Sequence, residues 1–343
     1  MIFYDAKNPD LFYVHSSLAI KENGYKRIEQ SDLEKIKKIN ENVATLATNS
    51  SGIGIKFETN SKKISLRVKL NGKSNMTHMS AVGQCGMDLY VYDDNYQKYV
   101  FHNTTKFDPS LSQYEIIIGN FETNAQRKIW IFLPLYMGVI SLEIGIEKNS
   151  ETKPLSFNNN KKIIFYGTSI TQGACASRAG MSYTNILTRW LDQEIYNFGF
   201  SGSAFLEKEV AAIIAKVNNP SILFIDAQPN AGIDERLEKN LDNFIKEFRK
   251  YHPNIIVMVA SRIDFAVDLY NSEKRNLNNY YQKWIKEYVL NKRKEGINIH
   301  FIDGKKIFKE DFTEMTVDGI HPTDLGFMSI SKYYFQAIKA QNY

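Results

Sequence analysis

The sequence contains few cysteines and no long apolar run. Cys85 and Cys175 are the two cysteines of the 343-residue chain, too few for the disulfide framework that stabilises small secreted domains. We expect both to be buried free thiols, since a thiol packs like a small apolar group; a single disulfide bridge between them is the alternative. No apolar stretch reaches the roughly 20 residues of a membrane-spanning helix, so we expect no membrane insertion.

A secretory signal is also missing from the start of the chain. The first residues, MIFYDAKNPDLF, contain no basic segment followed by an apolar run. We therefore expect a soluble protein, either cytoplasmic or secreted with its signal already removed. The sequence distinguishes neither the compartment nor the oligomeric state.

Charge of one sign is not in excess. The 43 Lys and Arg residues against 38 Asp and Glu residues give a net charge of +5. The basic residues are scattered, and the densest run, 292–294, belongs to an expected helix surface. A nucleic-acid partner would require a concentrated basic face, so we expect none.

Several chemical motifs are missing as well. The chain has no P-loop and no Gly-x-Gly-x-x-Gly turn, so we expect no nucleotide cofactor. None of the six histidines forms a His-Glu-x-x-His or similar pair, so we expect no metal. The absence of a Gly-x-Ser-x-Gly elbow disfavours an α/β-hydrolase of the lipase type.

The first half of the chain is rich in strand-like segments. Runs of β-branched and aromatic residues alternate with turn residues such as Asn71-Gly72. The expected strands cover residues 52–59, 63–70, 88–92, 114–119, 128–135 and 139–146. This spacing predicts an N-terminal β-sandwich domain, jelly-roll-like, over residues 1–150.

The residue pattern changes after a polar stretch at 151–160, which we interpret as a linker. Beyond it, apolar runs alternate with helical patterns. The expected strands are 162–166, 194–198, 222–226, 255–260 and 298–302, and the expected helices are 181–191, 208–216, 234–250, 274–291 and 323–340. This alternation predicts a three-layer α/β/α domain at 161–343 with a five-stranded parallel sheet.

Polar residues follow the expected strands of the second half. Ser169, Gly202 and Asn230 come shortly after the first, second and third strands, and Asp318 and His321 lie just before the last helix. In an open α/β sheet, ligands bind at the carboxyl ends of the strands. We therefore expect these residues to meet at one rim, although each motif alone is also compatible with an ordinary turn.

Together these residues provide the groups that acyl transfer needs. A serine hydroxyl is a weak nucleophile until a neighbouring base takes its proton. We expect His321 to be the base for Ser169, with Asp318 fixing the imidazole tautomer. Donors such as the amides near Gly202 and Asn230 stabilise a tetrahedral oxyanion by about 3 kcal/mol each.

The same segments resemble the blocks of the SGNH (GDSL-like) hydrolase superfamily. The segment GTSIT stands where the family has its Gly-Asp-Ser block. The resemblance implies a triad of Ser169, His321 and Asp318. It also implies an oxyanion hole made by the backbone N–H groups of Ser169 and Gly202 and the side chain of Asn230.

Two features depart from the family pattern or refine it. Thr168 replaces the usual Asp, and the third block has Gln228-Pro229-Asn230-Ala231 instead of Gly-x-Asn-Asp. The stretch Gly86-Met87-Asp88-Leu89-Tyr90 resembles the Gly-x-Asp-Leu-Tyr motif of one branch that carries an N-terminal β domain. Two-domain members are similar to carbohydrate O-acetylesterases, which implies hydrolysis of small acyl esters on a saccharide, without a cofactor.

Other roles stay open at this point. Arg178 and Gln228 are candidates for binding substrate, and a structural ion pair is an equal alternative for Arg178. Two other functions remain: an acyl hydrolase of lipase or thioesterase type, and a non-catalytic carbohydrate-binding protein. Both His78 and His102 are expected to lie in solvated loops or at a domain interface.

Overall fold

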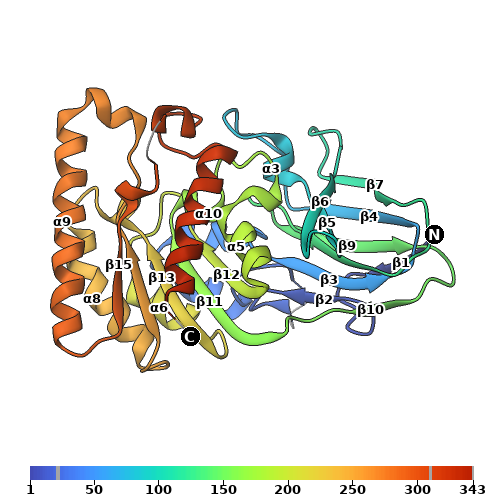
Figure 1. Cartoon of the computed structure of the whole chain (residues 1–343), viewed down its shortest axis with the longest axis horizontal. Helices are drawn as coiled ribbons and strands as arrows, with labels where there is room; N and C mark the ends of the chain where they lie inside the picture. Colours follow the sequence, from blue (N-terminus) through green and yellow to red (C-terminus); the bar gives the residue numbers. More distant parts are fainter. Residues whose placement is uncertain (21–23, 309–310, 342–343) are drawn as a thin grey trace.

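The computed structural model describes residues 1–20, 24–308 and 311–341. Antiparallel sheets form one end of the molecule and an α/β region forms the other (Figure 1). The predicted fold class, a β-sandwich followed by a three-layer α/β/α domain, is confirmed. Both cysteines are buried free thiols, as expected.

The N-terminal region contains two antiparallel sheets. Their strand orders are β1-β9-β4-β7 and β10-β3-β8-β5-β6, and β2 also pairs with β3. The strands are β1 (Ile2–Asp5), β2 (Tyr13–His15), β3 (Gly54–Thr59), β4 (Lys63–Leu70), β5 (Asp88–Asp93), β6 (Lys98–Thr104), β7 (Gln113–Asn120), β8 (Arg127–Phe132), β9 (Val139–Ile146) and β10 (Thr152–Pro154). Their inward-facing apolar side chains share one core, with Ile55, Leu66 and Ile131 fully buried, as expected for strands that alternate inward and outward residues.

The C-terminal region is built on a parallel sheet with the strand order β12-β11-β13-β14-β15. These strands are β11 (Asn159–Gly167), β12 (Gln193–Gly199), β13 (Pro220–Asp226), β14 (Ile256–Ala260) and β15 (Ile299–Ile302). All seven residues of β12 are buried, because helices cover both faces of a parallel sheet.

Separate sets of helices cover the two faces of this sheet. Helices α5 (Tyr183–Leu191) and α10 (Asp324–Lys339) pack on one face, in the cluster that contains Phe165 and Phe224. The opposite face is covered by α1 (Gln30–Lys37), α2 (Glu41–Leu46), α6 (Lys208–Ile214), α8 (Arg236–Arg249) and α9 (Ser272–Lys294). Helix α8 illustrates how such a helix packs against the sheet. Its apolar side chains form a stripe with helical spacing, and this stripe is buried: Leu237, Leu241, Phe244, Ile245 and Phe248.

The segments near the boundary between the two regions pack against both of them, whereas a simple linker at 151–160 would make few contacts. Strand β10 lies within 151–160 and pairs with β3. Helices α1 and α2 precede the β-sandwich strands β3–β9, yet pack with the helices of the parallel sheet. The division into residues 1–150, 151–160 and 161–343 therefore stays a prediction.

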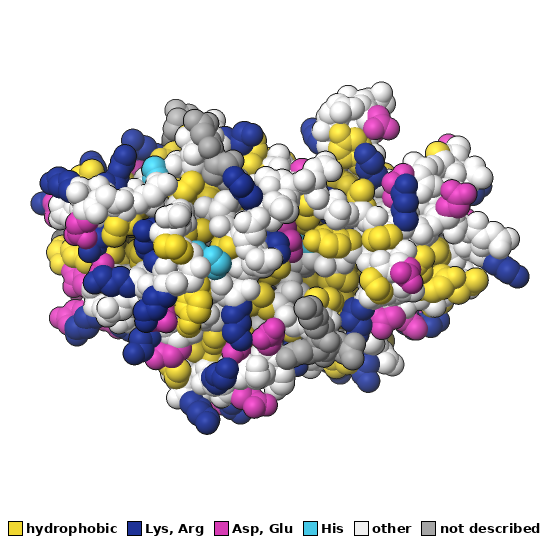
Figure 2. Space-filling view, turned by 90° about the horizontal axis from the view of Figure 1, so that it is seen from below, with side chains coloured by type: hydrophobic (Ala, Val, Ile, Leu, Met, Phe, Trp, Pro, Cys, Tyr) yellow, Lys and Arg dark blue, Asp and Glu magenta, His cyan; other side chains and the backbone are white. Residues whose placement is uncertain are grey.

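The surface agrees with the scattered charge of the sequence. On the face shown in Figure 2, cationic and anionic side chains are interspersed along the whole molecule. Among the described residues, no helix is long and apolar enough to span a membrane.

Candidate active site

Ser169 is placed by the end of the central strand. Strand β11 ends at Gly167, and Ser169 is the first residue of the short helix α4 (Ser169–Gln172). A Cβ at Gly167 would lie 2.0 Å from Thr171 Oγ1 and 2.7 Å from the Asp226 carbonyl oxygen. Only glycine fits this close approach of chains, which brings Ser169 to the rim of the sheet.

Strand register explains why distant segments meet at Ser169. In the pairing of β11 with its two neighbours, Gly167 lies opposite Gly199 and opposite Asp226. Three adjacent strands therefore end at the same level. The segments that follow them carry Ser169, Gly202 and Asn230, which is the arrangement expected at the carboxyl edge of a parallel sheet.

A tight loop before α10 holds Asp318 against His321. Oδ1 of Asp318 accepts hydrogen bonds from the backbone N–H groups of Ile320 (3.0 Å) and His321 (2.8 Å). Gly319 has a φ of +86°, which glycine adopts without strain. The Asp318 side chain thereby faces the imidazole three residues later.

Ser169, His321 and Asp318 form a continuous chain of hydrogen bonds. Ser169 Oγ lies 2.9 Å from Nε2 of His321, and His321 Nδ1 lies 2.7 Å from Oδ2 of Asp318. Partial burial acts to raise the pKa of Asp318, but the hydrogen bonds from His321 and Ile320 outweigh it and lower the pKa. An ionised Asp318 can hold the Nδ1–H tautomer of His321, which leaves Nε2 free to accept a proton from Ser169.

Gly202 and Asn230 line the same cavity as Ser169. Gly202 has a φ of +67°, and a Cβ added there would meet no atom within 4 Å, so its backbone is open to the adjoining space. Asn230 belongs to α7 (Gln228–Ala231), and its Oδ1 accepts a hydrogen bond from Ala204 N at 3.3 Å. This bond leaves the Asn230 amide NH2 available to another acceptor.

These groups open on a cavity of about 400 Å³. Its wall includes Ser169, His321, Gly202 and Asn230 together with apolar side chains. The apolar members are Ile170, Pro229, Ile233, Phe265, Val267, Leu277 and Ile320. A largely apolar pocket with a few convergent polar groups is the usual form of a small-molecule site.

The two substrate-binding candidates have different surroundings. Gln228 lies in the cavity wall, where its side chain donates to Asn278 Oδ1 (2.9 Å) and accepts from Arg262 N (2.7 Å). Arg178 is not among the residues that line this cavity. Arg178 instead forms a structural ion pair, the alternative to substrate binding that the sequence left open, with Nη1 located 2.7 Å from Oδ2 of Asp88.

The N-terminal region contributes side chains near the triad that we did not predict as site residues. The ring centroid of His78 lies 5.9 Å from that of His321, so this histidine is at the interface of the two regions. The hydroxyl of Tyr136 donates to the carbonyl oxygen of Ser169 at 3.5 Å. No local pattern in the sequence marks these contacts, because they join segments far apart in the chain.

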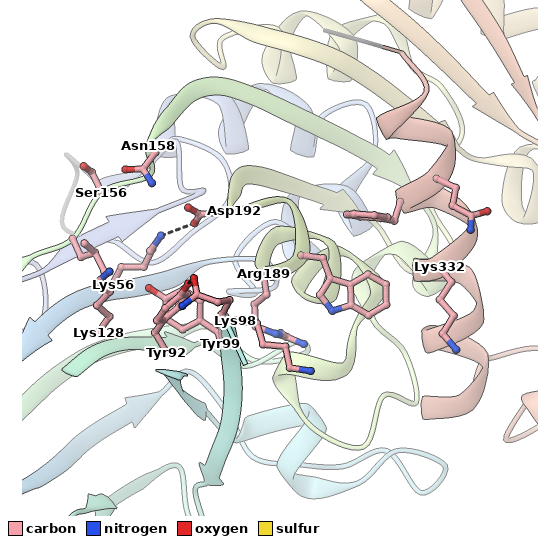
Figure 3. Close-up of a pocket in the computed structure, with 15 residues that line it drawn as sticks. Lys56, Tyr92, Lys98, Tyr99, Lys128, Ser156, Asn158, Arg189, Asp192 and Lys332 are labelled. Carbon is pink, nitrogen blue, oxygen red and sulfur yellow. Dashed lines mark hydrogen bonds and ion pairs between the residues drawn. The ribbon is translucent and has the colours of Figure 1, made fainter. Parts of the chain in front are cut away.

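A second, larger cavity of about 660 Å³ lies between the two regions of the molecule. Figure 3 shows cationic side chains around it, with Lys56 paired to Asp192 at 3.1 Å. Tyr92 and Tyr99 lie in its wall. Among the residues that the structure describes, none lines both this cavity and the one at Ser169, so we treat the two as separate.

Both regions of the chain match known families. Residues 160–339 match the GDSL-like Lipase/Acylhydrolase family, and residues 1–152 match the family described as the N-terminus of Esterase_SGNH_hydro-type. No curated protein matches the chain significantly.

Solved structures share the fold over nearly the whole chain. A protein from Bacteroides ovatus ATCC 8483, described as a GDSL-like lipase, is 28% identical with a TM-score of 0.89, covering 99% of this chain and 97% of its own. A salicylyl-acyltransferase from a tetracycline biosynthetic pathway is 14% identical with a TM-score of 0.81, over 99% and 97% of the two chains. An acetyl xylan esterase from Butyrivibrio proteoclasticus is 11% identical with a TM-score of 0.59, over 99% and 98%.

Proposed function

The chain belongs to the GDSL-like lipase/acylhydrolase family of carboxylic ester hydrolases, and from this premise we propose that it works as a serine esterase with Ser169 as the nucleophile. One observation carries the proposal: the hydrogen bonds of 2.9 Å and 2.7 Å that join Ser169 Oγ, the His321 imidazole and the Asp318 carboxylate. This order of groups is the one that activates a serine hydroxyl.

The proposed reaction has two halves. His321 Nε2 takes the proton of Ser169 Oγ while the oxygen attacks the ester carbonyl, and the imidazolium then gives that proton to the departing alcohol. Water, deprotonated by His321, attacks the acyl-enzyme and releases the carboxylic acid and free Ser169. Asp318 stabilises the imidazolium in both halves.

The negative charge of the tetrahedral intermediate needs preorganised donors. We assign these to the backbone N–H groups of Ser169 and Gly202 and to the side-chain NH2 of Asn230. The proposal is supported by their place in the wall of one cavity. Such donors stabilise the intermediate most where water is excluded, and Ser169 is only 8% exposed.

For the substrate, we propose O-acetyl esters on a saccharide. This choice rests on the fold shared with the acetyl xylan esterase, which is an analogy of fold. Hydrolysis of such esters by Ser169 requires no cofactor and no metal.

A specific observation favours a second candidate, an ester with a larger apolar acyl group. The cavity at Ser169 has about 400 Å³ and seven apolar side chains in its wall. An acetyl group would leave most of this volume unfilled, whereas burial of each additional methylene contributes about 0.8 kcal/mol.

Both candidates are tested with one substrate series. We would measure hydrolysis of acetylated oligosaccharides and of p-nitrophenyl esters from acetate to octanoate, for the wild type, Ser169→Ala and the control Ser329→Ala. Ser329 is half-buried on α10 and does not line the cavity at Ser169. We expect Ser169→Ala to lose at least about 10³-fold in kcat, with Ser329→Ala unchanged.

The outcomes are distinct. Preference for acetylated saccharides supports the acetylesterase, and preference for longer acyl chains supports the second candidate. Wild-type activity in Ser169→Ala would overturn the mechanism. Saccharide binding without hydrolysis of any ester would instead support the non-catalytic binder.

A further inference from the structure

Four metal-ligating side chains meet at the edge of the triad. His78, Cys175, Asp318 and His321 each offer one ligand atom, and these atoms all lie within 4.8 Å of one another. We infer that this cluster is an inhibitory site for a divalent cation of the zinc class. The inhibitory effect rests on the proposed function, whereas cation binding does not.

The four donors come from separate parts of the fold. His78 lies between β4 and α3 (Ala81–Cys85) in the N-terminal region, and Cys175 follows α4. Cys175 has a φ of +68°, in the left-handed region that non-glycine residues rarely adopt. The sequence could not indicate this site by spacing, because the donors are separated by about 240 residues of chain.

The chemistry of the donors selects the kind of cation. Two imidazole nitrogens, a thiolate and a carboxylate oxygen are ligands typical of Zn²⁺, which binds them at about 2.0 to 2.3 Å in a tetrahedron. Ligand atoms in such a tetrahedron are separated by roughly 3.3 to 3.8 Å, so the present donors need to move by about 1 Å. Calcium and magnesium prefer sets made only of oxygen.

Cation binding at this cluster must displace a proton from Cys175. Burial, with a contribution from Asp318, raises the pKa of the Cys175 thiol to about 12, so the free thiol is protonated at neutral pH. A coordinating cation converts a thiol into a thiolate. Binding of the cation by the thiolate therefore releases this proton to the solvent.

The tautomer of His321 links binding to inhibition. Nε2 of His321 faces Ser169 Oγ at 2.9 Å, while Nδ1 is on the side of Asp318 at 2.7 Å. The nitrogen available to the cation is therefore Nδ1. A neutral imidazole that binds a cation through Nδ1 carries its proton on Nε2, so it has no lone pair to accept the proton of Ser169.

Occupation also takes Asp318 away from its role in the triad. Of the four donor residues, His321 alone lines the substrate cavity, so the cation leaves that cavity open. We therefore expect a fall in kcat at an unchanged KM, reversed by a chelator.

Binding is tested first, without any activity, in the Ser169→Ala variant. Titration with Co²⁺ should give a single bound ion per chain, a thiolate-to-cobalt charge-transfer band, and displacement by Zn²⁺. Cys175→Ala in this background should lack the band. Cys85→Ala is the matched control, since Cys85 is the other buried thiol and lies outside the cluster.

Inhibition is tested next in chains with Ser169 intact. The Zn²⁺ concentration for half-inhibition, relative to each variant's own metal-free rate, should rise at least about tenfold in Cys175→Ala and His78→Ala. Equal zinc sensitivity in all variants, or no cobalt band in the Ser169→Ala chain, would overturn the inference. Full activity in Ser169→Ala would overturn the mechanism alone and leave the cobalt result standing.

Discussion

Asp88 of the N-terminal region and Arg178 of the C-terminal region form an ion pair across the two halves of the molecule, with Oδ2 and Nη1 separated by 2.7 Å. The same Oδ2 accepts a hydrogen bond from Gly180 N at 2.7 Å. Asp88 is the acid of the Gly-x-Asp-Leu-Tyr motif, and its side chain is fully buried. Through Asp88, this motif therefore connects the β-sandwich to residues 178–180, which follow the nucleophile Ser169 in the sequence.

We predict that Asp88→Ala destabilises the protein by about 3 to 5 kcal/mol, because the change leaves Arg178 partly buried without a counter-charge. Urea unfolding measures the loss. The control is Glu115→Ala, whose partner Arg67 is exposed, and we expect little change there. Similar stability of the two variants would show that the buried pair does not stabilise the folded protein.

Gly167→Ala tests how tightly the nucleophile turn is positioned. A Cβ at Gly167 would lie 2.0 Å from Thr171 Oγ1, so the backbone before Ser169 must move. Displacement of a reacting group by about 1 Å lowers rates by roughly 10²-fold, and we expect kcat to fall by that order.

Gly24→Ala is the control for this prediction, because a Cβ there meets its nearest atom at 3.5 Å, an ordinary contact. Unchanged kcat in Gly167→Ala would mean that the turn tolerates the shift and that its exact geometry does not determine the rate of the reaction at Ser169.

Asn230→Ala tests the third proposed oxyanion donor. Removal of one such donor lowers kcat by about 10² to 10³-fold, and we expect this effect with little change in KM. Asn279→Ala is the control, since Asn279 lies on α9 and its side chain accepts from Lys305. Equal kcat for both variants would exclude Asn230 from the oxyanion hole.

Asp226 should make stability depend on pH. Burial raises its pKa from 3.8 to about 6, against hydrogen bonds from Tyr334 and Tyr183 that act to lower it. Between these values the folded chain retains a proton that the unfolded chain has released. The protonated carboxyl therefore contributes stability in full below about pH 4, and this contribution is lost as the pH rises through about 6, by roughly 3 kcal/mol in total.

Asp226→Asn removes this titration. The difference in unfolding free energy between the variant and the wild type should shift in favour of the variant by roughly 3 kcal/mol from pH 4 to pH 7. Urea unfolding at several pH values provides the curves. Parallel curves would contradict the raised pKa of Asp226.

Local patterns were enough to predict much of the fold. The expected strands at 63–70 and 139–146 coincide with β4 and β9, because period-two alternation faces a single core. Strand β6 was missed, since its residues are partly or fully exposed and show no apolar alternation. Helix α4 was missed because four residues are too few for a periodic signal.

The candidate site likewise contains some residues that the sequence could predict and others that it could not. Ser169, Asp318 and His321 could be predicted because each follows a strand or precedes a helix within a short motif, and the structure brings their side chains together. The proximity of His78 to His321 could not be predicted, because it depends on how the two regions pack. The proximity of Cys175 to His321 could not be predicted either, because it joins two loops of the C-terminal region that are far apart in the sequence. The apolar wall of the cavity could not be predicted either, because its side chains come from several separate loops and helices of the C-terminal region.

The central claim is that His321 and Asp318 activate Ser169 as a nucleophile, and the most direct measurement is covalent capture. The intact chain would be treated with an alkyl fluorophosphonate, and the adduct located by peptide mass spectrometry. We predict a single adduct on Ser169, absent in Ser169→Ala and formed at least about 10³-fold more slowly in His321→Ala. An adduct on another residue, or an unchanged rate in His321→Ala, would contradict the account.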